Sequence, residues 1–154
     1  CPCGYYGDST RECRCTPPLI QRYLGKISGP LLDRIDIHIE VPAVKYKEMR
    51  SEDASEESSE IRQRVERARQ VQKQRGYDNA RLPTRLIRKY CRLDEAGERT
   101  FEMAVQRLGL SARAHDRILR VARTIADLSG ADSLASRHLA EAVQYRSLDR
   151  SYWT

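Results

Sequence analysis

Four of the five cysteines of this 154-residue chain lie in its first fifteen residues, as two Cys-x-Cys pairs nine residues apart. Glycines and an aspartate between the pairs favour tight turns that can bring the four sulfurs together. Four thiolates around one tetrahedral ion form a structural zinc site, although two to four residues usually separate the cysteines of a pair. Two disulfides are the alternative, but a fifth cysteine leaves an odd total. The pattern predicts a structural zinc loop with the ligands Cys1, Cys3, Cys13 and Cys15.

The sequence after this loop predicts one helix. Thr16 is a good N-cap, and Pro17 suits the first helical position. Apolar residues then recur at helical spacing, and Gly29 and Pro30 are expected to end the helix.

The segment SGPLLDRIDIHIEV, residues 28–41, predicts a strand. Its apolar residues alternate from Ile35 to Val41, and Pro42 cannot donate to a sheet ladder, so the strand should end there. At the start of this strand, Arg34 stands between two aspartates. The segment is expected to be one strand of an α/β core.

An acidic stretch divides the chain. It contains SEDASEESSE, which carries no large apolar residue and cannot bury enough surface to offset the entropy of ordering. We therefore predict three regions: residues 1–45 with the cysteine loop and the end of an α/β core, an acidic linker over 46–59, and a helical domain over 57–150.

Residues 57–150 show helical periodicity throughout, with start and stop signals at each break. A first helix should end at Gly76, and a short one should follow Pro83. Asp94 and Ser111 should cap the next two, and Ser133 precedes the last. Few helices with short loops indicate a small bundle, so the fold class is mainly α.

Charge and hydropathy limit the partners. The net charge of +6 and pI of about 9.2 favour polyanions such as nucleotides or nucleic acid. No apolar run approaches the roughly 18 residues that a membrane span needs, so no membrane partner is expected.

One arginine occupies an unfavourable helix position. Arg113 should be the second residue of the helix that Ser111 caps, where the macrodipole already places about half a positive charge. A bound anion would explain it, since exposed N–H groups and a guanidinium would converge on that anion. The alternative is an exposed side chain that turns into solvent.

Several segments together resemble the magnesium-chelatase-like AAA+ ATPases, closest to their competence-protein (ComM) type. They are CPCGYYGD with CRC, then SGPLLDRIDIHIEV, LSARAHDRILRVARTIADLSG and HLAEAVQYR. The resemblance covers nearly the whole chain except the acidic stretch. It implies a C-terminal portion: the end of an AAA+ core followed by an α-helical lid.

The resemblance also implies residue roles. LLDRID resembles the family segment with the arginine finger, so Arg34 would reach the γ-phosphate bound by a neighbouring subunit, where a planar cation stabilises transferring charge. LSAR resembles the sensor 2 element, so Arg113 would contact nucleotide phosphates. The full protein would be a cytoplasmic homo-oligomer, often a hexamer, that uses ATP and Mg²⁺ and acts on DNA in branch migration during natural transformation.

The chain itself contains no G-x-x-x-x-G-K-[ST] phosphate loop and no Walker B carboxylates. Because it begins with Cys1 rather than Met, we expect it to be part of a longer protein, inactive alone. Two alternatives remain open. One is a subunit of a magnesium chelatase proper. The other is a zinc-stabilised DNA-binding module with a helix-turn-helix near the C-terminal end, in which Arg137 and Arg146 would face a groove.

Overall fold

The structure, a computed structural model, describes residues 1–8, 10–39, 41, 44, 50 and 56–146. It divides into two compact units, the first running from Cys1 to Ile35 and the second starting at Asp36 and holding the helical bundle. Most of the predicted acidic linker lies outside the described residues, so a domain boundary at 46–59 stays a prediction.

The first unit consists of the cysteine loop and two short helices, α1 (Pro17–Leu24) and α2 (Gly29–Leu32). Thr16 and Pro17 begin α1 as predicted, but the helix ends earlier, at Gly25. Gly29 and Pro30 begin α2 instead of ending α1, because proline is well tolerated in the first helical turn. Neither helix buries a residue.

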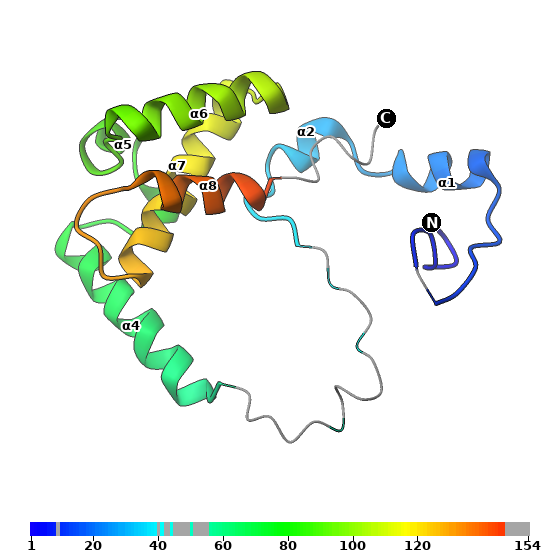
Figure 1. Ribbon diagram of the computed structural model, residues 1–154, viewed down its shortest axis with the longest axis horizontal. Helices are drawn as coiled ribbons and strands as arrows, with labels where there is room; N and C mark the ends of the chain where they lie inside the picture. The colour runs from blue at the N-terminus through cyan, green and yellow to red at the C-terminus, as the bar shows by residue number, and fades with distance from the viewer. Residues whose placement is uncertain (9, 40, 42–43, 45–49, 51–55, 147–154) are drawn as a thin grey trace. The chain divides into compact units, whose positions relative to one another are not determined.

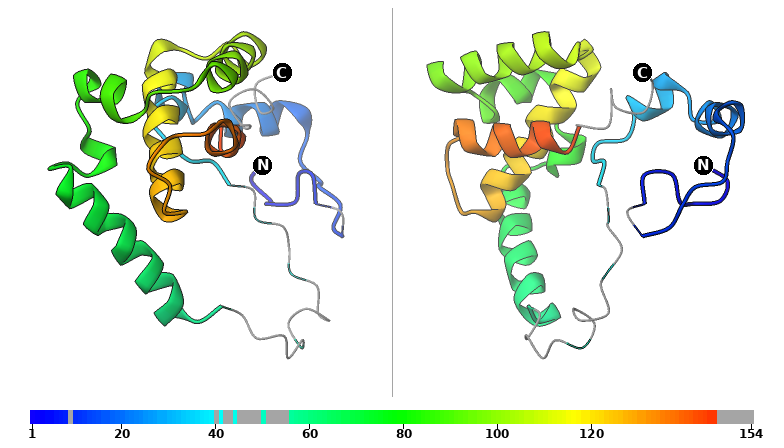
Figure 2. Two further views of the ribbon diagram at one scale, coloured as in Figure 1. Left: turned by 60° about the vertical axis from the view of Figure 1, so that its left-hand side comes forward. Right: turned by 45° about the vertical axis from the view of Figure 1, so that its right-hand side comes forward.

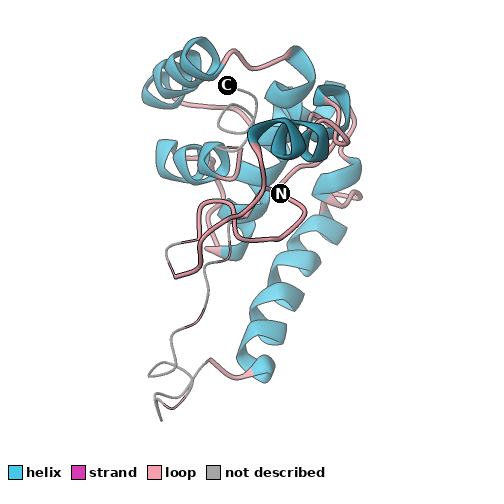
Figure 3. Ribbon diagram, turned by 90° about the vertical axis from the view of Figure 1, so that its right-hand side faces the viewer, coloured by secondary structure: helices cyan, strands magenta, loops and turns pink. Residues whose placement is uncertain are grey.

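The strand predicted from Ile35 to Val41 is wrong for the described part of this segment. No strand occurs in the portion of the chain that the structure describes, and helices and loops account for all of it (Figure 3). Ile37 and Ile39 are exposed to 46% and 66%. An extended segment becomes a strand only where a second one pairs with its backbone, and the described residues supply none.

The second unit is a bundle around one central helix (Figure 1). Its elements, in chain order, are α4 (Ser58–Gln74), the 3₁₀ helix η1 (Asn79–Arg81), α5 (Thr84–Tyr90), α6 (Glu95–Leu108), α7 (Ala112–Leu128) and α8 (Ser136–Gln144). Helix α7 contacts α4, η1, α5 and α8, and α8 also contacts α6. The core therefore forms around α7.

Local capping explains where these helices start and stop. The Asp94 carboxylate accepts a hydrogen bond from the Gly97 amide at 2.7 Å, and the Ser111 hydroxyl accepts one from the Ala114 amide at 3.1 Å. Gly109 ends α6 in the left-handed region, at φ 57°. The last helix begins later than Ser133 suggested. Its N-cap is Ala135, whose amide donates to His138 Nδ1 at 3.1 Å.

A buried polar network joins three elements of the bundle. The fully buried Asp127 carboxylate accepts from Arg75, the C-cap residue of α4, from Arg123 Nε at 3.0 Å and from Asn79 Nδ2 of η1 at 2.7 Å. Arg123 also donates to the carbonyls of Ala131 and Asp132, in the loop after α7. Such a site is stable only when every polar group has a partner.

Helix α4 is only partly covered. Ala68 and Gln72 are buried, whereas the apolar residues Ile61, Val65 and Val71 are about 40% exposed. Helix α4 contacts α7, and in both views of Figure 2 the N-terminal half of α4 extends away from the other helices of the bundle. Among the described helices, none combines the length and apolar character that crossing a membrane requires.

Candidate functional site

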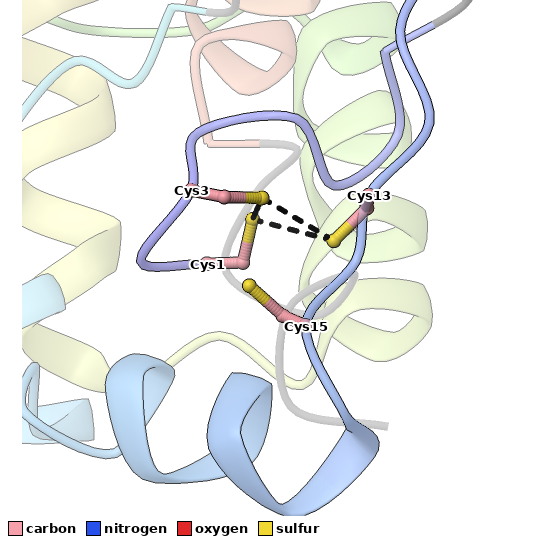
Figure 4. Close-up of side chains that lie close together, drawn as sticks. All are labelled: Cys1, Cys3, Cys13 and Cys15. Atoms are coloured by element: carbon pink, nitrogen blue, oxygen red, sulfur yellow. Dashed lines mark hydrogen bonds between the residues drawn. The ribbon is translucent and has the colours of Figure 1, made fainter.

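The structure brings the four N-terminal cysteines together, as the sequence predicted (Figure 4). Their sulfur atoms all lie within 4.8 Å of one another. Cys1 and Cys3 are 3.4 Å apart, and Cys13 lies 3.6 Å from Cys3 and 3.7 Å from Cys1. A Zn–S bond of about 2.3 Å would place tetrahedral ligands roughly 3.8 Å apart. The cluster is one that could hold a metal ion.

The distances between the four sulfur atoms are too long for disulfide bonds. A disulfide joins sulfurs at about 2.05 Å, and all five cysteines, which lie in the described part of the chain, are free. The fifth, Cys91, belongs to the core of the bundle and is 3% exposed. Burial raises the pKa of the Cys91 thiol to about 11, which marks it as an inert structural residue.

Turns and backbone donors shape the cysteine loop. Gly4 and Gly7 have φ near +80°, a conformation that glycine adopts without strain. The Tyr6 amide donates to the Cys1 sulfur at 3.2 Å. The Tyr5 backbone N–H, with support from the neighbouring thiols, lowers the pKa of Cys3 to about 7. A thiol with this pKa is partly thiolate at neutral pH, the form that binds metal.

Arg34 lies in the turn that follows α2, and not at the start of a strand. Its side chain is exposed, and the guanidinium donates to the Pro30 carbonyl at 2.9 Å. Of the flanking aspartates, Asp36 forms an ion pair with Arg117 of α7. This aspartate therefore contacts the central helix of the bundle, and the sequence did not reveal this ion pair.

Arg113 is the second residue of α7, as predicted, and its side chain is exposed. No acidic residue occurs in the first turn of this helix, so nothing there offsets the macrodipole. Arg34 belongs to the first unit and Arg113 to the second.

A cleft beside α7 escaped the sequence reasoning. It has a volume of about 370 Å³, and its lining includes Arg88, Arg92, Thr84 and His115. The His115 ring stacks on Phe101 with a centroid distance of 4.6 Å. The signal that could have found this cleft is the spacing of basic residues on and just after α5, where Arg85, Arg88, Lys89 and Arg92 recur at i, i+3, i+4 and i+7.

The structure also bears on the helix-turn-helix alternative. Seven residues separate α7 from α8, whereas that motif uses a turn of three or four. Arg146 is 1% exposed and cannot face a groove, whereas Arg137 is exposed. This geometry does not favour groove reading by α8.

Two family models match the chain. The model described as magnesium chelatase, subunit ChlI C-terminal, covers residues 55–146, and the one described as magnesium chelatase, subunit ChlI, covers residues 1–49. The class is that of the magnesium-chelatase-like AAA+ proteins, and the chain belongs to this family in its ComM/YifB group.

The relatives support this assignment. The competence protein ComM of Haemophilus influenzae is 41% identical over 151 residues, and the YifB protein of Salmonella typhimurium is 44% identical over 153. The Mb2921c protein of Mycobacterium bovis is 36% identical over 151. These alignments cover 95–97% of this chain and 29% of each relative. The chain thus spans less than a third of the length of these proteins.

Proposed function

We propose that this chain is the arginine-finger and lid portion of an ATP-driven AAA+ motor that acts on DNA, in branch migration during natural transformation and recombination. The observation that carries the proposal is membership of the magnesium-chelatase-like AAA+ family together with the similarity to a protein named competence protein ComM. The full protein would be a cytoplasmic homo-oligomer, a hexamer in our proposal, using ATP and Mg²⁺.

In this proposal two arginines act on nucleotide phosphates. Arg34 would extend from its exposed turn to the γ-phosphate held by a neighbouring subunit, and Arg113 would contact the nucleotide of its own subunit. The free, exposed position of Arg113 at the N-terminal turn of α7 supports its role, because exposed amides and a guanidinium there favour an anion. The exposure of Arg34 fits a residue that acts across a subunit boundary.

The four-cysteine cluster would hold a structural zinc ion. All four ligand positions would be filled by Cys1, Cys3, Cys13 and Cys15, so no coordination position would stay open for catalysis. The ion would fix the loop that precedes α1, which has no hydrophobic core of its own.

A basic stripe on α5 and the residues just after it supports DNA as the partner. The stripe consists of Arg85, Arg88, Lys89 and Arg92, all exposed, while Ile87 and Cys91 on the other side are buried. The described chain has no acidic residue from position 79 to 93. Such a stripe complements the phosphate backbone, which supplies most sequence-independent affinity.

The test uses the full-length protein. ATP turnover should rise with added DNA, and replacement of Arg34 by alanine should lower turnover at least about 10³-fold, as for other arginine fingers, while nucleotide affinity is kept. Arg22→Ala, which removes an exposed arginine from α1, is the matched control and should keep normal turnover.

A magnesium chelatase subunit is the second candidate, favoured by the descriptions of the two family models. Stimulation of turnover by a porphyrin substrate and not by DNA would replace the motor with a chelatase. Normal turnover in Arg34→Ala would remove the finger role under either substrate.

A further inference from the structure

One long-range contact joins the segment after Arg34 to the central helix of the bundle. Asp36 forms an ion pair with Arg117 of α7, a residue 81 positions later in the chain. Two positions on, the His38 amide donates to the Tyr145 carbonyl, just after α8, at 2.8 Å. Residues 36–38 therefore contact both α7 and the residue that follows α8.

The segment that makes these two contacts, residues 36–39, is not tightly packed. Ile37 and Ile39 border a groove of about 460 Å³, together with apolar residues of α7 that include Val121 and Ile125. The side chains of the ion pair keep 49% (Asp36) and 25% (Arg117) of their surface exposed. Polar contacts over a partly filled groove can open without the core being disrupted, because little apolar surface is lost.

In the sequence, the two residues of the ion pair are close neighbours of the two predicted phosphate-contacting arginines. Arg34 precedes Asp36 by two residues, which limits the distance between their Cα atoms to about 7 Å. Arg113 precedes Arg117 by four residues on α7, about 6 Å along the same helix face. The ion pair thus joins a residue two positions after Arg34 to a residue four positions after Arg113.

We propose that the Asp36–Arg117 ion pair couples the nucleotide contact of one subunit to the arginine finger that it offers to the next. This inference rests on the proposed function. A nucleotide bound by Arg113 shifts the start of α7, Arg117 moves with that helix, and Asp36 carries the turn of Arg34 along. Asp36 and Arg117 are positioning residues, because neither contacts the nucleotide.

The coupling is reciprocal by linkage, so a finger engaged in the neighbouring site also favours the nucleotide-bound arrangement of its own lid. A partly exposed ion pair suits this role better than a buried one. It is weak in itself, so a modest difference in nucleotide contacts is enough to shift it between closed and open arrangements.

The experiment reverses the charges in the full-length protein. Asp36→Arg and Arg117→Asp should each lower kcat for ATP about tenfold and change KM by less than about twofold. The double variant, which restores an ion pair in the opposite sense, should return kcat to within about twofold of the starting protein. Arg99→Glu is the control, because it breaks the exposed Arg99–Glu95 pair elsewhere in the bundle and should leave kcat unchanged.

Hydrogen exchange supplies a readout that does not depend on turnover. The His38 amide should exchange faster in Asp36→Arg and recover its protection in the double variant. Two results would overturn the coupling: a normal kcat in the single variants, or a kcat in the double variant as low as the product of the two single effects. In either case a low turnover in Arg34→Ala would still support the finger role. Normal turnover in Arg34→Ala would instead overturn the finger role on which the coupling depends.

Discussion

The two units of this chain use different means to hold a fold. Within Cys1–Ile35 no described residue is buried, and the feature that organises the start of the unit is a cluster of four sulfurs. The helical unit has a continuous apolar core around α7, with Leu82, Ile118, Ala122 and Leu139 nearly inaccessible. A short segment without a core needs a cross-link or a metal to stay ordered. The units should therefore respond to different perturbations.

Metal removal should give the largest difference between the units. We expect about one zinc ion per chain and none in Cys13→Ser, because three thiolates no longer close a tetrahedral site. Metal-binding free energy becomes folding free energy in such loops. A chelator should therefore speed the cleavage by trypsin after Arg11 and Arg14, while the thermal unfolding midpoint of the bundle stays unchanged. Elemental analysis and limited proteolysis would measure both effects.

The matched control is Cys91→Ala, which removes the cysteine of the other unit. It should keep the zinc content and lower the stability of the bundle, because Cys91 is packed in its core. A full zinc complement in Cys13→Ser, or an intact loop after chelation, would contradict the contrast between the units.

Asp127→Ala should damage only the helical unit. The change removes the carboxylate that two largely buried arginines share. The side chain of Arg123 is 2% exposed and that of Arg75 is 14% exposed. Breaking a buried ion pair on one side costs about 3–5 kcal/mol of unfolding free energy, which urea denaturation followed by circular dichroism would detect. Arg99→Ala, which breaks an exposed pair, should change little. A similar loss of unfolding free energy in Asp127→Ala and Arg99→Ala would show that burial of the ion pair does not determine its contribution to stability.

His138 should make the bundle sensitive to mild acid. Burial, helped by the nearby Arg137 and Arg123, lowers the pKa of His138 below its usual value of 6.5. The unfolded chain then takes up a proton at a higher pH than the folded chain does. Stability is therefore complete above about pH 7 and falls as the pH drops through 6.5 towards the folded pKa. Urea unfolding between pH 7.5 and 5.5 should show this decline in the original chain.

The control for this pH dependence is His138→Gln, which removes the titrating group. The difference in unfolding free energy between the two chains should be constant above pH 7 and should change below pH 6.5. A constant difference over the whole interval would show that other groups cause the decline.

The smallest expected effect concerns Arg113. Its replacement by alanine removes a cation from the positive end of the α7 dipole, so the bundle should be more stable by a few tenths to about 1 kcal/mol. In the full-length protein the same change should weaken the response to nucleotide. A bundle destabilised by Arg113→Ala would instead assign this arginine a structural role.

Much of the helical unit could be predicted because its signals are local. Asp94 and Ser111 cap α6 and α7 where the sequence indicated, and Gly109 ends α6. Gly25 and Gly29 show the limit of such reasoning. Both are plausible helix ends, and the structure places one at the end of α1 and the other at the start of α2.

The strand predicted from Ile35 to Val41 failed for a related reason. Alternating apolar residues show that a segment suits a strand, but pairing requires a second segment that periodicity does not identify. The ion pairs of Asp36 and Asp127 were also missed. Their partners lie 81 residues away in one case and 52 in the other, and charge alone does not select a partner at such separations.

The sequence by itself determined the helical class, the N-caps of α6 and α7 and the four cysteines of the candidate metal site, because backbone propensities and ligand spacing act over a few residues. Only the tertiary structure decided that Asp36 binds Arg117, that Arg123 and Arg146 are buried, and that α4 leaves Ile61 and Val65 exposed. Burial and long-range pairing depend on how helices pack against one another, and packing is a property of the assembled bundle.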